Sequence, residues 1–337
     1  MHVLITGGTG RVGRAVTERF VRHGWDVRVI GIEPEFEFAR ADYAVCDIMN
    51  YDALREQMQG CQAVVHLAAI ASPTSALGHE LFQINVAGAF NVFEAAAAEG
   101  IRRIVQASSI NAFGCFWGNT DISPQYFPID EEHPTFTTDP YSFSKGIVEE
   151  IGDYYWRREG ISSVAIRLPG VWSKEGVKSK DFQQKLRETH KLLDEFAGQP
   201  EAERLARLAE VRKIALDYRR QRLLEFPAAQ AGWITTGFSD DPLWLVYNFA
   251  RFKFWAFVDE RDSAQAMEKG VTADFEGSHA LFVGAPHNSI GYNSETLVRL
   301  FFAEVSRRKK ILSGSETLIS IDKARALIGF EPEHSIP

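Results

Sequence analysis

The feature that most constrains the fold is a glycine-rich turn that begins at Gly7. The apolar run Val3-Leu4-Ile5 predicts a buried strand, and the periodic segment after the turn predicts a helix that ends near residue 23. Because glycines carry no side chain, the backbone N–H groups and the helix N-terminus of such a turn lie open to a pyrophosphate. This strand, turn and helix order is typical of a dinucleotide-binding site. The candidate binding residues are Gly7, Gly10, Arg11, Val12 and Gly13.

Further apolar runs alternate with helical segments along the first half of the chain. Strands are expected at 27–30, 43–45, 63–67, 104–107 and 163–167. Helices are expected at about 52–58 and 81–98, and from Asp139-Pro140 to about Arg158, where Asp suits the N-cap and Pro the first helical position. This alternation predicts an α/β fold, a doubly wound parallel (Rossmann) sheet with helices on both faces.

Composition excludes several classes of protein. The 337 residues are 45% apolar and 24% charged, which is enough for a sizeable core and two lobes. No apolar run approaches the roughly 20 residues of a membrane span, and no secretory signal is recognisable, so we expect a soluble, cytoplasmic protein. Acidic residues exceed basic ones by 45 to 37, which argues against a nucleic-acid binder.

The cysteines and histidines indicate neither a disulfide framework nor a metal site. Cys46, Cys61 and Cys115 are odd in number and have no CxxC spacing. The nine histidines form no HxH or HxxxH pair. No metal is therefore expected.

The character of the chain changes at Lys174. Residues 174–225 contain 13 Lys or Arg and 10 Asp or Glu, and their apolar residues recur at helical spacing on both sides of Gly198-Gln199-Pro200. This pattern predicts a helical hairpin that packs on the second lobe; a lid or a partner-binding arm are alternatives. We therefore divide the chain into a Rossmann domain (1–173), a charged helical insertion (174–227) and a substrate-binding lobe (228–337) with elements that return to the Rossmann domain. The aromatic-rich segment 231–257 is expected to form core, with Trp172 and Trp255 as candidates for the pocket.

Two acidic positions are candidates for the adenosine half of a dinucleotide. Glu33 follows the second expected strand, where a carboxylate accepts hydrogen bonds from the ribose diol of NAD. Asp47-Ile48 follows the third strand and is placed to meet the adenine amino group. NADP stays an alternative, because Arg11 is a possible cation for its 2′-phosphate.

The segment Tyr141-Ser142-Phe143-Ser144-Lys145 places a phenol and an ammonium on one helix face, at i and i+4. A phenol with an ordinary pKa near 10 acts as a base near pH 7 only if nearby positive charge stabilises the phenolate. Ser109 follows the strand at 104–107, at the sheet edge that carries ligands in such folds, and is expected to hydrogen-bond the reacting oxygen.

Taken together, the chain resembles the extended short-chain dehydrogenase/reductase superfamily, the branch of NAD-dependent epimerases and dehydratases, with features similar to uronate dehydrogenases. The resemblance implies that Tyr141 is the acid/base, that Lys145 positions the nicotinamide ribose and lowers the tyrosine pKa, and that Ser109 orients the substrate. It further implies a proton-relay role for Asn85, a cofactor cleft lined by Leu67, Ala68 and Ala69, and a homodimer formed through the helix that carries Tyr141 and the helix before it.

Departures from the family patterns narrow the expected reaction. Ser109-Ile110-Asn111 replaces the Thr-Asp-Glu of similar dehydratases, and Arg167-Leu168-Pro169-Gly170 lacks the Asn and Tyr-Gly-Pro of nucleotide-sugar enzymes. We expect hydride transfer between NAD and a secondary alcohol of a sugar, sugar acid or related small polyol. An epimerase that retains its cofactor and a catalytically silent NAD-binding scaffold are the alternatives. The candidate substrate contacts are Ser72, Ser109, Asn111 and Trp172.

Overall fold

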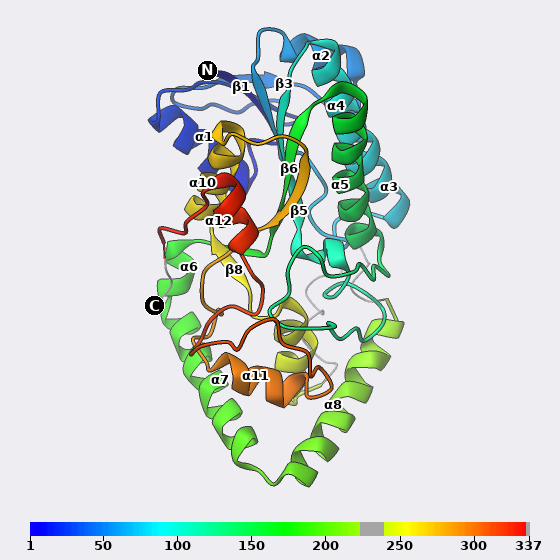
Figure 1. Ribbon diagram of the computed structural model, residues 1–337, viewed down its shortest axis with the longest axis vertical. Helices are drawn as coiled ribbons and strands as arrows, with labels where there is room; N and C mark the ends of the chain where they lie inside the picture. Colours follow the sequence, from blue (N-terminus) through cyan, green and yellow to red (C-terminus); the bar gives the residue numbers. More distant parts are fainter. Residues whose placement is uncertain (223–238, 335–337) are drawn as a thin grey trace.

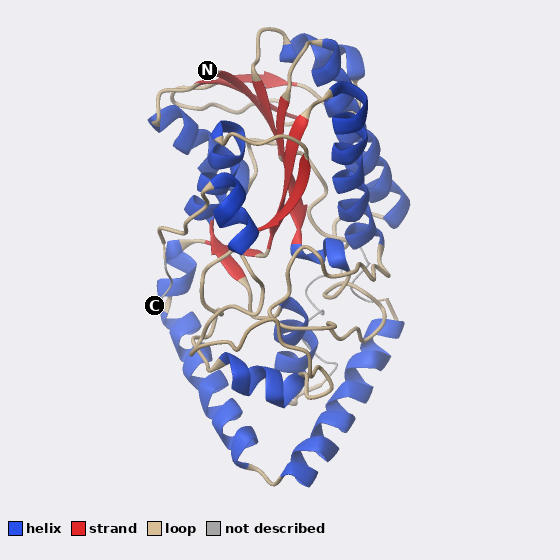
Figure 2. Ribbon diagram, viewed as in Figure 1, coloured by secondary structure: helices blue, strands red, loops and turns tan. Residues whose placement is uncertain are grey.

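A parallel sheet forms the centre of one half of the computed structural model, which describes residues 1–222 and 239–334 (Figures 1 and 2). Its strands are β1 (His2–Thr6), β2 (Asp26–Gly31), β3 (Asp42–Val45), β4 (Ala63–His66), β5 (Arg103–Ser109), β6 (Ser162–Leu168) and β9 (Ser278–Phe282). Their order is β3-β2-β1-β4-β5-β6-β9, and all neighbours are parallel. The predicted doubly wound α/β fold is confirmed.

Both faces of the sheet are buried beneath helices. In β1, Val3 and Ile5 join the apolar core on one face and Leu4 joins the core on the other, as the alternation of a strand requires. The first face carries α1 (Arg11–Arg22), α10 (Glu260–Thr272) and α12 (Asp322–Ile328). The second face carries α2 (Tyr51–Met58), α3 (Gly78–Phe82), the π-helix η1 (Gln83–Ala87), α4 (Gly88–Ala98) and α5 (Pro140–Glu159).

Helix α5 begins and ends where its sequence predicts. The Asp139 side chain accepts a hydrogen bond from the Ser142 N–H at 2.8 Å, and Pro140 occupies the first turn. Gly160 ends the helix with a φ of 67°, a conformation that favours glycine. These caps place Tyr141 and Lys145 in the first two turns, at the same end of the molecule as the carboxyl ends of the strands.

The second lobe lies beyond that edge and has its own apolar core. Its elements are η2 (Ile110–Phe113), α6 (Lys174–Lys178), α7 (Lys180–Gly198), α8 (Glu201–Arg220), α9 (Pro242–Leu245), η5 (Val246–Ala250), η6 (Arg251–Lys253), α11 (Ser294–Phe301) and the short parallel pair β7 (Gly170–Trp172) and β8 (Phe257–Asp259). In Figure 1, α7 and α8 form a V on either side of α11. The aromatic side chains of Trp244, Phe252 and Phe254 belong to this core, as expected, and so does Trp255, which was a candidate for the pocket.

The insertion helices α7 and α8 pack on this lobe. Leu193 and Phe196 of α7, and Val211 and Tyr218 of α8, are buried in its core. Packing of the charged hairpin on the second lobe is therefore what the structure shows. Trp233 and Phe238, and the proposed boundary at residue 227, lie outside the described residues, so the three-part division stays a prediction.

The N-cap of α10 and the strand β7 are not among the features predicted above. Asp259, rather than Asp262, caps α10 by accepting the Arg261 N–H at 2.9 Å. Asp262 instead accepts the backbone N–H groups of Glu333 and His334, each at 3.0 Å, which ties the C-terminal segment to α10. The three side chains lie close enough together to share a metal ion, but Asp262 is already engaged by these hydrogen bonds. The short strand β7 has too few residues to show a period.

Helices long and apolar enough to cross a bilayer do not occur among the described residues.

Candidate active site

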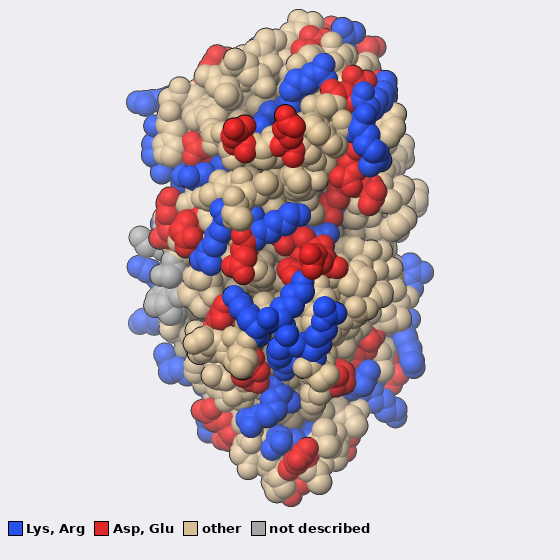
Figure 3. All heavy atoms as spheres, in the orientation of Figure 1, with Lys and Arg blue, Asp and Glu red and all other residues tan. Residues whose placement is uncertain are grey.

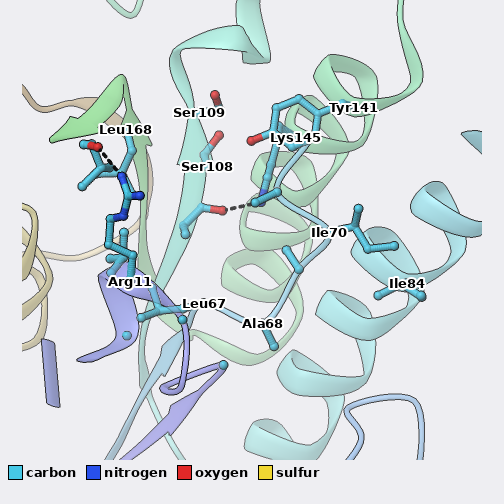
Figure 4. Close-up of a pocket in the computed structure, with 18 of the residues that line it drawn as sticks. Arg11, Leu67, Ala68, Ile70, Ile84, Ser108, Ser109, Tyr141, Lys145 and Leu168 are labelled. Carbon is cyan, nitrogen blue, oxygen red and sulfur yellow. Dashed lines mark hydrogen bonds between the residues drawn. The ribbon is translucent and has the colours of Figure 1, made fainter. Parts of the chain in front are cut away.

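A cavity of about 740 Å³ runs along the carboxyl ends of the central strands, where ligands bind in open α/β sheets. It gathers residues that lie far apart in the sequence, from Gly7 to Lys253. Fifteen of the predicted site residues line it: Gly7, Gly10, Arg11, Val12, Gly13, Glu33, Asp47, Ile48, Leu67, Ala68, Ala69, Ser109, Asn111, Tyr141 and Lys145. Figure 4 shows part of this lining, with Arg11 and Leu67 on one side and Tyr141 and Lys145 on the other.

The glycine turn has the geometry that a pyrophosphate requires. Gly7 has a φ of 66°, and a Cβ there would lie 2.6 Å from the Ala68 backbone nitrogen. A Cβ at Gly13 would lie 2.4 Å from the Gly7 carbonyl oxygen, so both positions need glycine. Helix α1 starts after Gly10 without a side-chain cap, which leaves its first N–H groups for an anion. The turn therefore fits a dinucleotide phosphate.

Arg11 is directed away from the adenosine end of the cavity. Its guanidinium donates a hydrogen bond to the Val171 carbonyl of β7 at 3.0 Å (Figure 4). Glu33 lines the opposite end, beyond β2, and its backbone carbonyl accepts a hydrogen bond from the Tyr43 hydroxyl at 2.7 Å. Asp47 accepts the Met49 N–H at 2.9 Å in the neighbouring turn. The carboxylates of Glu33 and Asp47 thus lie at this end, while the Arg11 cation is held elsewhere.

Tyr141, Lys145 and Ser109 meet at the other end of the cavity. The Lys145 ammonium donates to the Ala107 carbonyl at 2.9 Å and lies 5.9 Å from the centre of the Tyr141 ring. The Ser109 hydroxyl interacts with the phenol and lowers its pKa. The Ser109 hydroxyl also accepts the Asn111 backbone and side-chain N–H groups, each at 3.1 Å, which fixes its position. Two rigid elements, α5 and β5, therefore hold the three groups (Figure 4).

Burial dominates the titration of this cluster. Burial raises the pKa of Tyr141 to about 12, the Ser109 hydrogen bond lowers it, and the charge of Asp139 raises it further. Burial lowers the pKa of the Lys145 ammonium to about 8, against the opposite effect of the Glu149 carboxylate. The Lys145 ammonium is directed to the Ala107 carbonyl, and its expected effect on the tyrosine pKa stays a prediction.

Glu149 is a positioning residue that the sequence analysis missed. Its carboxylate accepts the Ser108 hydroxyl at 2.6 Å and binds the Arg167 guanidinium through two hydrogen bonds of 2.9 and 2.7 Å. The spacing could have identified it, because Tyr141, Lys145 and Glu149 lie at i, i+4 and i+8, on one face of α5. This network joins α5, β5 and β6 directly behind the reacting groups.

Three predicted site residues do not line the cavity. The Asn85 side chain bonds the backbone of Ile70 and the hydroxyl of Ser144, so it ties the loop after β4 to α5. Trp172 stacks on Phe257 with ring centres 5.1 Å apart. The Ser72 hydroxyl bonds Thr74 within its own loop at 2.7 Å. Trp255, the other tryptophan considered for the pocket, is buried in the core of the second lobe.

Comparison with known proteins decides the family. Residues 3–196 match the NAD dependent epimerase/dehydratase family. The chain belongs to this family. Its cofactor is NAD, which accepts or returns a hydride when bound. The residues of the cavity fit that cofactor: the glycine turn would hold its phosphates, and Ala68, Ser109 and Lys145 continue the lining toward Tyr141.

Individual relatives are sugar dehydrogenases and epimerases. The chain is 31% identical over 184 residues to an L-arabinose 1-dehydrogenase (NAD(P)(+)) of Haloferax volcanii, covering 53% of this chain and 70% of that protein. It is 29% identical over 169 residues to a uronate dehydrogenase of Pseudomonas putida, covering 50% and 60%. A UDP-glucose 4-epimerase from Thermotoga maritima shares the fold with a TM-score of 0.61 and 17% identity, covering 99% and 94%. The matches to the two dehydrogenases thus span about two thirds of those proteins.

Proposed function

We propose that this protein transfers a hydride reversibly between NAD and a secondary alcohol of a sugar, sugar acid or related small polyol. The observation that carries the proposal is one cavity with a phosphate-binding glycine turn at one end and Tyr141, Lys145 and Ser109 at the other. Sugar dehydrogenases among the relatives support the same substrate class. Oxidation of an alcohol requires both ends of the cavity, because the reacting carbon must lie against the cofactor while its hydroxyl lies against a base.

The proposed roles follow from the contacts. Tyr141 takes the proton of the substrate hydroxyl as the hydride leaves the adjoining carbon. Ser109 donates a hydrogen bond that stabilises the reacting oxygen and the phenolate. Lys145 contributes positive charge at the same end and contacts the nicotinamide ribose. Asn85 acts as a positioning residue, because its side chain links the loop after β4 to α5.

NAD rather than NADP is the proposed partner of the adenosine end. Glu33 lines that end, and its carboxylate suits a ribose diol and repels a 2′-phosphate. Arg11, the cation considered for a 2′-phosphate, is hydrogen-bonded to Val171 instead. Asp47 and Ile48 are the proposed contacts of the adenine ring.

We further propose a homodimer formed through α4 and α5, in the cytoplasm. The exposed aromatic side chains of these helices support the dimer. Phe90 of α4 is 40% exposed, and Phe143 and Tyr154 of α5 are 49% and 40% exposed. Aromatic side chains are enriched at interfaces between protein chains.

A screen of neutral sugars, sugar acids and sugar phosphates with NAD and NADP tests the proposed reaction. We expect NADH to accumulate with at least one sugar-type alcohol, and NAD to be used in preference to NADP. Interconversion of epimers without net NADH, together with cofactor retained on purification, would instead identify an epimerase, the alternative that the family also contains. Binding of NAD without either reaction would contradict the proposal and identify a catalytically silent scaffold.

A further inference from the structure

The cavity contains one cation that the mechanism does not use. Among its described lining residues three are cationic, Arg11, Lys145 and Lys253. The Arg11 and Lys145 side chains donate hydrogen bonds to the carbonyls of Val171 and Ala107. The Lys253 ammonium has neither a hydrogen bond nor an ion pair with any residue in 1–222 or 239–334.

Lys253 is held in place by an aromatic platform at the reacting end. Its ammonium lies 4.3 Å from the centre of the Phe116 ring. Phe116 and Trp117 also line the cavity, and they follow Ser109 in the sequence through the short helix η2. The side chain of Lys253 therefore reaches the cavity beside the loop that begins at the reacting serine.

A buried arginine fixes both sides of this contact. Arg219 of α8 donates to the Phe116 carbonyl at 2.7 Å and to the Gly118 carbonyl at 2.8 Å. The same guanidinium bonds the side-chain and backbone oxygens of Asn248, at 3.1 and 2.8 Å, five residues before Lys253. The platform and the segment that carries the ammonium are thus tied to the same charged insertion helix.

The backbone after Lys253 adopts an unusual conformation. Phe254 and Trp255 have φ values of 54° and 50°, in the left-handed region that side chains of this size rarely occupy. The turn buries both aromatic rings in the core of the second lobe while Lys253 stays exposed toward the cavity. Such strain persists where surrounding structure fixes it, and it concentrates at functional sites.

The carboxylates of the cavity lining lie at one end of the cavity. The carboxylates among the described lining residues are Glu33 and Asp47, which follow β2 and β3 at the adenosine end. The uncharged polar side chains that line the rest of the cavity include the hydroxyls of Ser109 and Tyr141 and the amide of Asn111. An ammonium without a carboxylate partner among the described lining residues favours a ligand that carries an oxyanion.

We propose that Lys253 binds an anionic group, a carboxylate or a phosphate, of the molecule whose hydroxyl Tyr141 deprotonates. This inference rests on the proposed function and narrows its substrate to a sugar acid or a sugar phosphate. A charge-assisted hydrogen bond of this kind changes affinity by about 10- to 100-fold. Lys253 is then the residue that selects anionic over neutral sugars.

The test compares glucuronate, glucose 6-phosphate and glucose, with NAD present, by turnover and by quenching of tryptophan fluorescence. The wild-type protein should bind one of the anions more tightly than glucose, and the two anionic arms separate carboxylate from phosphate. Lys253→Met should weaken binding of that anion about 10- to 100-fold and leave glucose within about twofold, whereas Lys253→Arg should restore part of the loss. Lys213→Met, an exposed change of the same charge on α8, should behave as wild type.

The possible results distinguish failure of the anion site from failure of the proposed reaction. If an anion binds in a Lys253-dependent way but no NADH forms, the reaction is wrong and the anion site stands. If NADH forms from glucose as readily as from the anions, or if Lys253→Met affects all three sugars equally, the anion site is wrong and the reaction stands. Failure of both anions to bind also overturns the anion site.

Discussion

At the scale of single residues, the site combines a buried phenol with groups that control its proton. Burial raises the pKa of Tyr141 to about 12, so the phenol is protonated at neutral pH. In the direction of reduction this phenol is ready to donate. In the direction of oxidation it must accept a proton, and the Ser109 hydrogen bond is the neighbouring interaction that lowers its pKa.

Ser109→Ala should therefore move the pH profile as well as lower the rate. Removing the Ser109 hydrogen bond raises the pKa of Tyr141, and oxidation needs the unprotonated form. The rising limb of kcat/KM against pH for oxidation should shift to higher pH, and kcat should fall about 100- to 1,000-fold. Initial rates at saturating NAD across the pH range measure both effects.

Ser306→Ala is a matched control, because Ser306 is exposed on the second lobe. It should keep the wild-type profile. A Ser109→Ala variant with an unchanged limb and an unchanged kcat would contradict the proposed role of Ser109.

Some residues of the site could be predicted from the sequence and others could not, and the difference has a physical reason. Tyr141 and Lys145 were predictable because i and i+4 share a helix face whatever the tertiary structure. Lys253 was not, because its place depends on a left-handed turn and on Phe116, which lies more than a hundred residues earlier in the chain. The stacking of Trp172 on Phe257 was not predictable either, because no local pattern shows whether an aromatic ring will face a cavity or pack on a neighbour.

At the scale of elements, the insertion hairpin supports the lobe that completes the cavity. Phe196 of α7 is buried against Phe301 of α11, with ring centres 6.1 Å apart. On α8, Tyr218 packs against Trp244 at 5.4 Å, next to Arg219. The hairpin is thus part of the core of the second lobe, and Arg219 connects it to the platform under Lys253.

Phe196→Ala should destabilise the protein by about 3–5 kcal/mol, because it removes a buried ring and leaves a cavity. Leu205→Ala on α8 is the matched control: Leu205 is 53% exposed, and its loss should cost less than about 0.5 kcal/mol. Urea unfolding followed by tryptophan fluorescence measures both changes. Equal losses from the two variants would show that α7 does not pack as described.

Elements were predicted well where a pattern is long enough to show its period. Strands β1 to β6, α5 with its caps, and the division of the hairpin near residue 199 followed from such patterns. The strands β7 and β8 have three residues each, too few to show a period, and they pair with each other although they lie far apart in the sequence. The π-helix η1 likewise depends on tertiary contacts, among them the bonds of Asn85 to Ile70 and Ser144.

At the scale of the whole molecule, charge is mixed rather than segregated. On the face in Figure 3, Lys and Arg side chains gather over the region of α11 with acidic side chains beside them. The basic run at 307–310 illustrates this arrangement, since Lys309 pairs with Asp130 and Glu132 and Lys310 pairs with Glu316. Lys309 and Lys310 are thus paired with carboxylates, whereas Lys253 in the cavity lining has no ion pair with any described residue.

The central claim is that Tyr141 is the acid/base of an NAD-dependent oxidoreductase, and Tyr141→Phe tests it most directly. The variant keeps the buried ring and removes only the hydroxyl. We predict that NADH formation with the best sugar substrate falls at least about 100-fold while the dissociation constant of NAD stays within about twofold. Turnover close to wild type in the Tyr141→Phe variant would contradict the account.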